Sequence, residues 1–469
     1  MFTSTNPTNS SEVITTVPET TTAEILTVLR KAKNAQKGWA KLPAPTRGRI
    51  IANVGRLVEK NKEELAKLIT KEMGKVYTEA LGEVQEVVDT CDFFLGEGRR
   101  LYGQTVPSEM QNKNLFTFRM PVGNVFVITA GNFPTAVPSW YIVPALLAGN
   151  TVVWKPSEFT PAVANALTSI FHAGGVPQDV LITVVADGVQ TFAALESGLK
   201  EGVINKVGFT GSTAVGRKIG AKTGEYIQSA CLELGGKNPQ IIFPDANIDA
   251  LIDAVVFGVY FNMGECCNSG SRIIIHEDVV EEFQEKVVAH SKKVKLGDPL
   301  DPSVKFGAII NKMQLDKIKK YVDSGTAQGA KLLLGGNQIT INNGNYFEPT
   351  IFTDVKPEME IACEEIFGPV LSILTFKTRK EAIEIANSTP FGLSAGVWTK
   401  DLDTAMIMTR EIDAGTVWVN NWMSGNPEIP FGGFKQSGIG RELGPGAIDE
   451  FMETKSVMIK TEVSNGSWV

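Results

Sequence analysis

The feature that most constrains the fold of this chain is its repeated alternation of short apolar runs with stretches of helical periodicity. In the first half, the strand-like runs are rich in β-branched residues and lie at 125–128, 151–154, 180–185 and 206–210. The helical stretches that follow them lie at 138–147, 161–173 and around 215–219. A second series of strand-like runs lies at 240–243, 271–276, 370–376 and 415–420. Strands that alternate with helices form parallel sheets covered on both faces, so the sequence predicts an α/β fold.

Further helices are predicted from capping residues and apolar periodicity. Thr21 and Glu24 form a capping-box pattern before an amphipathic stretch, and Thr378 and Glu381 form a second one before a short helix. The other predicted helices run at 46–73, 81–95, 279–294 and 313–330. Residues 1–19 are polar and rich in Ser and Thr, so they are expected to form a tail without the features of a signal peptide.

Length, charge and cysteine content argue against several classes of protein. A chain of 469 residues predicts two large domains, and a net charge of −7 without clustered basic residues argues against nucleic-acid binding. No charged residue lies between Arg119 and Lys155, but prolines and glycines interrupt this stretch, so a buried core segment is expected there and not a membrane span. Five cysteines are an odd number in a large chain, which favours reduced thiols and a cytoplasmic location.

Two adjacent cysteines, Cys266 and Cys267, are the first candidates for chemistry. They lie within 262–270, where Gly, Asn and Ser residues predict a turn in which a side chain can face a cleft. The alternative is that both are small buried hydrophobes, which is how free cysteines usually behave. Taken alone, this segment favours the buried alternative over a reactive thiol.

A second candidate is Glu233, which stands between two leucines before a glycine pair. Apolar surroundings would raise the pKa of its carboxyl group and let it act as a base near neutral pH. The alternative, a solvent-facing glutamate on an edge strand, is favoured by this evidence alone. His172, His276 and His290 lie outside polar loops, so a Cys–His hydrolase has weak support. No Cys or His spacing suits zinc, so no metal is expected.

Two segments have features of a nucleotide site. Small residues from Phe209 to Gly216 follow a strand and open a helix, where backbone N–H groups can bind a pyrophosphate. Lys155 and Glu158 follow another strand, at the end where open parallel sheets bind ligands. A glutamate there can accept from a ribose 2′-hydroxyl and repel a 2′-phosphate, which favours NAD over NADP. No GxGxxG fingerprint is present, and an exposed turn with two solvated charges is the alternative for Lys155 and Glu158.

Taken together, several segments resemble the aldehyde dehydrogenase superfamily, in the family's order and over nearly the whole chain. They are Gly131-Asn132-Phe133-Pro134, Lys155-Pro156-Ser157-Glu158, Phe209-Thr210-Gly211-Ser212, Glu233-Leu234-Gly235-Gly236-Lys237, Gly264-Glu265-Cys266-Cys267, Glu365-Ile366-Phe367-Gly368-Pro369 and Pro430-Phe431-Gly432-Gly433. The resemblance implies an enzyme that oxidises a small-molecule aldehyde to its carboxylic acid with NAD as the cofactor.

The resemblance also implies roles for individual residues. Cys267 would be the catalytic thiol, Glu233 the general base and Asn132 the side-chain donor of an oxyanion hole, with the backbone N–H of Cys267 as second donor. The residues implied in binding NAD are Thr129, Lys155, Ser157, Glu158, Gly211, Ser212, Glu365 and Phe367. Those implied in lining the substrate pocket are Val137, Trp140, Asn268, Trp422, Gly425 and Phe431. This mixture suits a modest aliphatic or aromatic aldehyde.

These residue types suit a covalent mechanism. The thiolate adds to the aldehyde, two aimed donors stabilise the resulting alkoxide, and hydride leaves to the nicotinamide. Water that Glu233 deprotonates then hydrolyses the thioester left on Cys267. A thiol suits the first step better than a serine hydroxyl, because a thiol is appreciably ionised near neutral pH.

The resemblance implies two Rossmann-like parallel-sheet domains and a small β element. The parts are a cofactor domain at 1–102 and 122–233, a catalytic domain at 234–448, and a bridging element at 103–121 and 449–469. Strand-like alternation at 104–120 and 455–462 would leave exposed sheet edges, so this element is expected to pair with another subunit. A homodimer or a homotetramer is expected, and the sequence does not separate the two.

Two residues depart from the family pattern. Gly131 stands where many members have an aromatic residue, and Glu265 stands where glutamine is commoner, so substrate fit and rate are not fixed by the resemblance. Arg99 and Arg100 could contact an acidic substrate, although an exposed helix end is the favoured interpretation.

Two other functions stay open from the sequence. Relatives that pass the acyl group to coenzyme A usually lack the base, so the presence of Glu233 argues against that activity. A non-catalytic binding protein with this fold is the other alternative, and the joint presence of Cys267, Glu233 and Asn132 argues against it.

Overall fold

A six-stranded sheet forms the centre of the first half of the molecule, in a computed structural model that describes residues 1–461. The strand order is β19-β9-β8-β5-β6-β7. The strands are β5 (Asn124–Ile128), β6 (Thr151–Lys155), β7 (Leu181–Thr183), β8 (Lys206–Thr210), β9 (Ser229–Glu233) and β19 (Gly438–Ile439). All neighbours pair in parallel except β19, which pairs antiparallel with β9. Because β19 covers β9, the strand that ends at Glu233 is not an edge strand.

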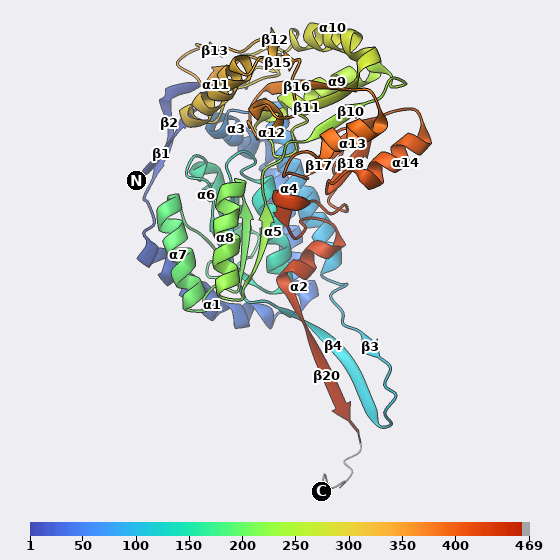
Figure 1. The fold of residues 1–469 in the computed structure, drawn as a ribbon. Coiled ribbons are helices and arrows are strands. Elements are labelled where there is room, and N and C mark those ends of the chain that lie inside the picture. The colour runs from blue at the N-terminus through green and yellow to red at the C-terminus, as the bar shows by residue number, and fades with distance from the viewer. Residues whose placement is uncertain (462–469) are drawn as a thin grey trace.

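Helices cover both faces of this sheet, as the sequence predicts. They are α1 (Thr22–Ala40), α2 (Ala44–Lys60), α3 (Lys62–Met73), α4 (Tyr77–Glu97), α5 (Ala136–Ala148), α6 (Pro161–Ala173), α7 (Gly188–Lys200) and α8 (Thr213–Glu225). The core of one face is formed with α1, α7 and α8, and the core of the other with α2 to α6 (Figure 1). Both faces of the central strands are therefore removed from water, which explains their nearly uninterrupted apolar sequences.

A seven-stranded sheet with the order β12-β15-β16-β11-β10-β17-β18 forms the second half. Its strands are β10 (Pro239–Ile242), β11 (Arg272–His276), β12 (Lys331–Leu334), β15 (Thr350–Thr353), β16 (Val370–Phe376), β17 (Ser394–Trp398) and β18 (Thr416–Val419). Its helices are α9 (Ile248–Tyr260), α10 (Val280–Ser291), α11 (Lys312–Ala327), α12 (Glu360–Cys363), α13 (Arg379–Asn387) and α14 (Leu402–Glu411). A small hairpin joins β13 (Gln338–Ile339) and β14 (Tyr346–Phe347), and four short 3₁₀ segments lie at 261–264, 277–279, 435–437 and 445–451. All pairs in the main sheet are parallel except β12 with β15.

A three-stranded arm projects from the body of the molecule (Figure 1). It contains β3 (Thr105–Val106), β4 (Lys113–Pro121) and β20 (Met452–Lys460) in the order β20-β4-β3. β20 and β4 pair over their whole lengths, and β20 is an edge of this sheet. The arm falls within the predicted bridging element, of which residues 462–469 lie outside the described part of the chain.

The sequence predicts several elements with their observed bounds, including α6, β8 and β16. Thr21 and Glu24 form the predicted capping box at the start of α1. The uncharged stretch after Arg119 forms the end of β4, then β5, α5 and β6, and within residues 1–461 no helix has the length and hydropathy to cross a bilayer. The elements without a counterpart in the prediction include the helices α7, α9, α12 and α14 and the strands β9, β12, β13, β14, β15, β17 and β19.

Two predictions of local structure are wrong. The polar tail is instead a hairpin of β1 (Phe2–Asn6) and β2 (Asn9–Val17), whose Ser4 hydroxyl donates to the Glu72 carboxylate of α3 at 2.5 Å. The single helix at 46–73 is instead α2 and α3, because the backbone leaves the helical region at Asn61, with φ −101° and ψ 13°. The first error arises because Ser4 finds a tertiary partner that local periodicity does not reveal, whereas at Asn61 the side-chain amide donates locally, to the Leu57 carbonyl at 2.7 Å.

Candidate active site

The loop that carries Cys267 follows α9 and is held by an unusual backbone. Asn262, Met263 and Gly264 have φ values of 53°, 55° and 75°, which lie in the left-handed region. A side chain at Gly264 would overlap the backbone of Gly368, so only glycine fits there. The Asn238 amide donates to the carbonyls of Cys267 and Ser269 at 2.9 Å each. These contacts fix the position of the sulfur-bearing residue.

Cys267 is partly exposed, whereas Cys266 is buried and its thiol donates to the Asn268 side-chain oxygen at 2.8 Å. Cys267 lines a cavity of about 330 Å³. Of the predicted pocket residues, the cavity wall includes Val137, Trp140, Asn268, Gly425 and Phe431. Trp422 is buried behind the wall instead, where its ring lies 4.9 Å from that of Trp418. The structure therefore brings the thiol and most of the predicted lining residues together.

Glu233 lies at the carboxyl end of β9, only 2% exposed, with its register partner Gly438 on β19. The alternative of a solvent-facing glutamate on an edge strand is therefore wrong, because β19 covers that edge. Its Oε1 atom has no hydrogen-bond partner among the described residues. Burial first, and the neighbouring Cys267 second, raise the pKa of Glu233 well above its ordinary value.

The surroundings of the Cys267 thiol act on its pKa in opposite directions. A hydrogen bond with the Cys266 thiol and then burial raise the pKa of Cys267 well above the value of a free cysteine, while the contact with Glu233 lowers it. Because Glu233 interacts directly with Cys267 and its pKa is also raised, the carboxylate is in place to take the thiol proton.

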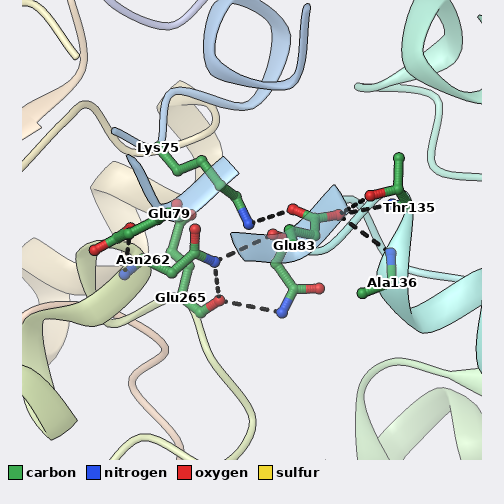
Figure 2. Close-up of polar contacts among 8 residues, drawn as sticks. Lys75, Glu79, Glu83, Thr135, Ala136, Asn262 and Glu265 are labelled. Atoms are coloured by element: carbon green, nitrogen blue, oxygen red, sulfur yellow. Dashed lines mark hydrogen bonds and ion pairs between the residues drawn. The ribbon is translucent and has the colours of Figure 1, made fainter. Parts of the chain in front are cut away.

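Asn132, in the loop between β5 and α5, contacts the Cys267 loop directly. Its side-chain amide donates to the Glu265 carbonyl at 3.1 Å. The amide of Asn262 donates to the same carbonyl at 2.8 Å and to the Asn132 carbonyl at 3.2 Å, as the dashed lines of Figure 2 show. A primary amide has two N–H donors, so Asn132 retains one for a substrate oxygen.

Helix α4 and the turn before it hold both loops from behind (Figure 2). The buried Lys75 ammonium pairs with Glu83 at 2.7 Å and lies 3.9 Å from the centre of the Phe133 ring. Glu83 also accepts from the N–H and hydroxyl groups of Thr135, at 2.7 Å each, at the start of α5. One helical turn away, Glu79 accepts from the Asn262 N–H at 3.1 Å. The same helix thus fixes the segment after Asn132 and the segment before Cys267.

A second cavity, of about 230 Å³, lies at the carboxyl ends of β5, β6 and β8 and beside the start of α8. Its wall includes the predicted cofactor residues Thr129, Lys155, Ser157, Glu158 and Gly211. The Lys155 ammonium and the Glu158 carboxylate lie 3.0 Å apart, a donor and an acceptor suited to vicinal hydroxyls. Lys155 is buried, so the alternative of an exposed turn with two solvated charges is wrong for it. Apolar side chains of α7 and α8 provide a surface for a flat base.

The remaining predicted cofactor residues lie apart from this cavity wall. Ser212 caps α8, its hydroxyl accepting from the Val215 N–H at 3.4 Å. Glu365 accepts from the Gly236 N–H at 3.0 Å, and burial raises the pKa of its carboxyl group. Phe367 has a φ of 59°, and its carbonyl accepts from the Gln314 amide at 2.6 Å. Glu365 contributes to the raised pKa values of Glu233 and Cys267, which places it on the catalytic side of the site.

Comparisons with known proteins identify the family of this chain. A sequence model described as the aldehyde dehydrogenase family matches residues 1–457. The chain belongs to the aldehyde dehydrogenase family. It is 41% identical to retinaldehyde dehydrogenase 3 of Mus musculus over 429 residues, which are 91% of this chain and 83% of that protein.

Solved structures of other family members superpose on nearly the whole chain. An NAD-dependent aldehyde dehydrogenase from Sinorhizobium meliloti has a TM-score of 0.96 and 39% identity, over 100% of this chain and 93% of that one. An indole-3-acetaldehyde dehydrogenase of P. syringae in complex with NAD⁺ has a TM-score of 0.95 and 36% identity, over 98% of this chain and 93% of that one. The names of these relatives differ in the aldehyde, so membership of the aldehyde dehydrogenase family does not fix the substrate.

The place of Glu442 in this aldehyde dehydrogenase site was not predictable from the sequence. Glu442 is 3% exposed, and its buried carboxyl group lies beside the Tyr141 hydroxyl, which lowers its pKa and so partly offsets the effect of burial. Burial raises its pKa to about 8, and its charge contributes to the raised pKa of Glu233. No local pattern around Glu442 indicated this, because only the pairing of β19 with β9 brings its segment beside Glu233.

Proposed function

We propose that this chain oxidises an aldehyde to the carboxylic acid, with NAD as the hydride acceptor and Cys267 as the covalent nucleophile. The observation that carries the proposal is the position of Cys267 between two features: an aromatic cavity on one side and the buried carboxyl group of Glu233 on the other. A nucleophile beside a base, at the end of a substrate-sized cavity, is the arrangement that acyl chemistry requires.

The first step is addition of sulfur to the aldehyde. The thiol proton passes to Glu233, and the sulfur forms a bond to the carbonyl carbon while the carbonyl oxygen takes the electron pair. The Asn132 amide and the Cys267 backbone N–H donate to this oxygen. Loss of one such donor raises the barrier by about 3 kcal/mol, because donors that are aimed before the reaction need no reorganisation.

The cofactor cavity supports binding of NAD through Lys155 and Glu158 at one end. NAD, when bound, supplies a nicotinamide ring that accepts a hydride. The protein residues hold the tetrahedral adduct in position, and collapse of its alkoxide leaves a thioester on Cys267. Glu233, once its first proton has passed to solvent, takes a proton from a water molecule, whose oxygen attacks the thioester carbon. The acid leaves, and the departing Cys267 sulfur takes this proton back from Glu233 to restore the thiol.

We also propose the division into parts that the resemblance implies. Residues 1–102 and 122–233 form the cofactor domain, residues 234–448 the catalytic domain, and the arm joins copies of the chain into a homodimer or homotetramer. The exposed edge of β20 supports the last point. A reducing compartment such as the cytoplasm suits the five cysteines, all of which are free thiols.

The proposal is tested by NADH absorbance with the pair Cys267→Ala and Cys266→Ala. We expect Cys267→Ala to lose at least about a thousandfold of aldehyde oxidation, since the covalent route is removed, and Cys266→Ala to retain most of it. Added coenzyme A should leave the NADH yield of the parent unchanged. Full activity in Cys267→Ala, or turnover only with coenzyme A, would contradict the proposal.

A further inference from the structure

The cavity that ends at Cys267 has an acidic wall. Helix α4 contributes Gly82, Glu86, Asp89 and Thr90 to it, residues that share one face of the helix. An adjoining hollow of about 330 Å³ is lined by Glu79, Glu83 and Glu86 of the same helix. Within the described part of the chain, no lysine, arginine or histidine lines either space.

The rest of the cavity wall is aromatic. The rings that line it are those of Phe133, Trp140, Phe257, Phe261, Trp418 and Phe431. Several pack on one another at the wall, with ring centres 5.9 Å apart for Phe133 and Phe261 and 5.4 Å apart for Trp140 and Phe431. The faces of aromatic rings carry partial negative charge, so a cation is attracted to such a wall more strongly than a neutral group of equal size.

The two carboxylates of this wall are held by neutral donors. Glu86 accepts from the Trp140 indole N–H at 3.0 Å, and Asp89 accepts from the Gln85 amide at 2.8 Å. By contrast, Glu83 is already paired with Lys75. Burial and the nearby Glu83 raise the pKa of Glu86 to about 7, so a cation that entered the cavity would favour the ionised form of Glu86.

We propose that the substrate is an aldehyde with a cationic group, an amine or a quaternary ammonium, at the end remote from the carbonyl. The aldehyde carbon reaches Cys267, and the cation lies among the rings beside Glu86 and Asp89. An anionic aldehyde would be repelled by the same carboxylates, and a neutral one would lack the attraction. This inference rests on the proposed function and adds the substrate class to it.

The test compares three aldehydes that differ in charge. They are 4-(trimethylammonio)butanal, its neutral carbon isostere 5,5-dimethylhexanal, and the anion succinic semialdehyde. We expect kcat/KM of the parent protein to fall in that order, with the cation preferred over its isostere by roughly tenfold or more, the scale of a desolvated cation–π contact with carboxylate support.

The carboxylates are tested by Glu86→Gln, which keeps an oxygen acceptor for the Trp140 indole, and by Asp89→Asn at an exposed position. We expect each to reduce the cation-to-isostere ratio of kcat/KM several-fold. Glu201→Gln, a carboxylate that pairs with Arg30 far from the cavity, is the matched control and should leave the ratio unchanged. If Glu86→Gln does not fold, Asp89→Asn decides.

Different results would contradict the substrate class and the dehydrogenase activity. If the isostere is oxidised at least as well as the cation, or if neither variant changes the ratio, the inferred substrate class is wrong while the dehydrogenase activity stands. If none of the three aldehydes, nor a broad panel of other aldehydes, yields NADH, the proposed function itself is wrong.

Discussion

At Cys267 the protein surrounds a thiol with groups that oppose its ionisation at rest. The Cys266 thiol and burial raise the pKa of Cys267, and burial also raises the pKa of Glu233. Glu233, beside this thiol, is the proposed base that takes the thiol proton when the sulfur adds to the aldehyde.

The charge of Glu442 is predicted to set the acidic limb of the pH–rate profile. Its charge raises the pKa of Glu233, and Glu233 acts only when ionised, so activity falls as pH drops through that pKa. Glu442→Gln removes the charge and should move the acidic limb of kcat to lower pH. Glu225→Gln, an exposed carboxylate on α8, should leave the profile unchanged. A limb that stays in place or moves to higher pH would count against this coupling.

At the scale of elements, α4 is the support on which the two active-site loops rest. Glu83 accepts three N–H or O–H donors at the start of α5, and Glu79 accepts the Asn262 N–H before the Cys267 loop. Glu79 and Glu83 are one helical turn apart, so the same rigid helix fixes the positions of both loops. A shift of this helix would change the distance between the Asn132 amide and the sulfur.

The Lys75–Glu83 pair on this support is predicted to be energetically coupled. Glu83→Gln leaves the Lys75 ammonium buried without its partner, a change that typically costs about 3–5 kcal/mol, and Lys75→Met leaves an unpaired carboxylate. The double variant removes both charges, so its loss of melting temperature should be smaller than the sum of the two single losses. Thermal unfolding of the four proteins measures this. Additive losses would show that the pair does not act as a unit.

Local sequence signals account for some elements and not for others. Both ends of helix α6 were predictable, because Pro161 begins the helix and Gly174 ends it. The hairpin of β1 and β2 was not predictable, because its many Ser and Thr residues are typical of a polar tail. Only the tertiary hydrogen bond from Ser4 to Glu72 of α3 shows that this segment is ordered against the body.

Within the candidate site, too, some residues were predictable from the sequence and others were not. Cys267, Glu233 and Asn132 lie in segments that a family pattern reveals. Glu86 and Glu442 lie in unremarkable sequence, and they reach the site only through the packing of α4 against the cavity and of β19 against β9.

In the molecule as a whole, the three-stranded arm projects from the body and exposes apolar side chains. Phe118 and Met458 are 50% and 74% exposed on it, and β20 leaves one edge unpaired. Exposed apolar residues on an open edge mark a surface for another chain. The two large sheets and their helices form the body of the molecule, and the arm extends away from this body (Figure 1).

The arm is therefore predicted to mediate self-association. The double variant Phe118→Lys and Met458→Lys should lower the mass in solution, by light scattering after size-exclusion chromatography, towards that of the monomer. Met313→Lys is the matched control, since Met313 is 69% exposed on α11 in the body. An unchanged mass for the double variant, or an equal loss for the control, would contradict the assignment.

We propose above all that the sulfur of Cys267 carries the acyl group. The most direct measurement is mass spectrometry of the parent protein, acid-quenched during turnover with NAD and an aldehyde that it oxidises, together with the NADH formed. We expect an acyl group on Cys267, at no more than one per site, that is still found on Cys267 when Cys266 is replaced by alanine. NADH formation with an unmodified Cys267, or an acyl group on another residue, would contradict it.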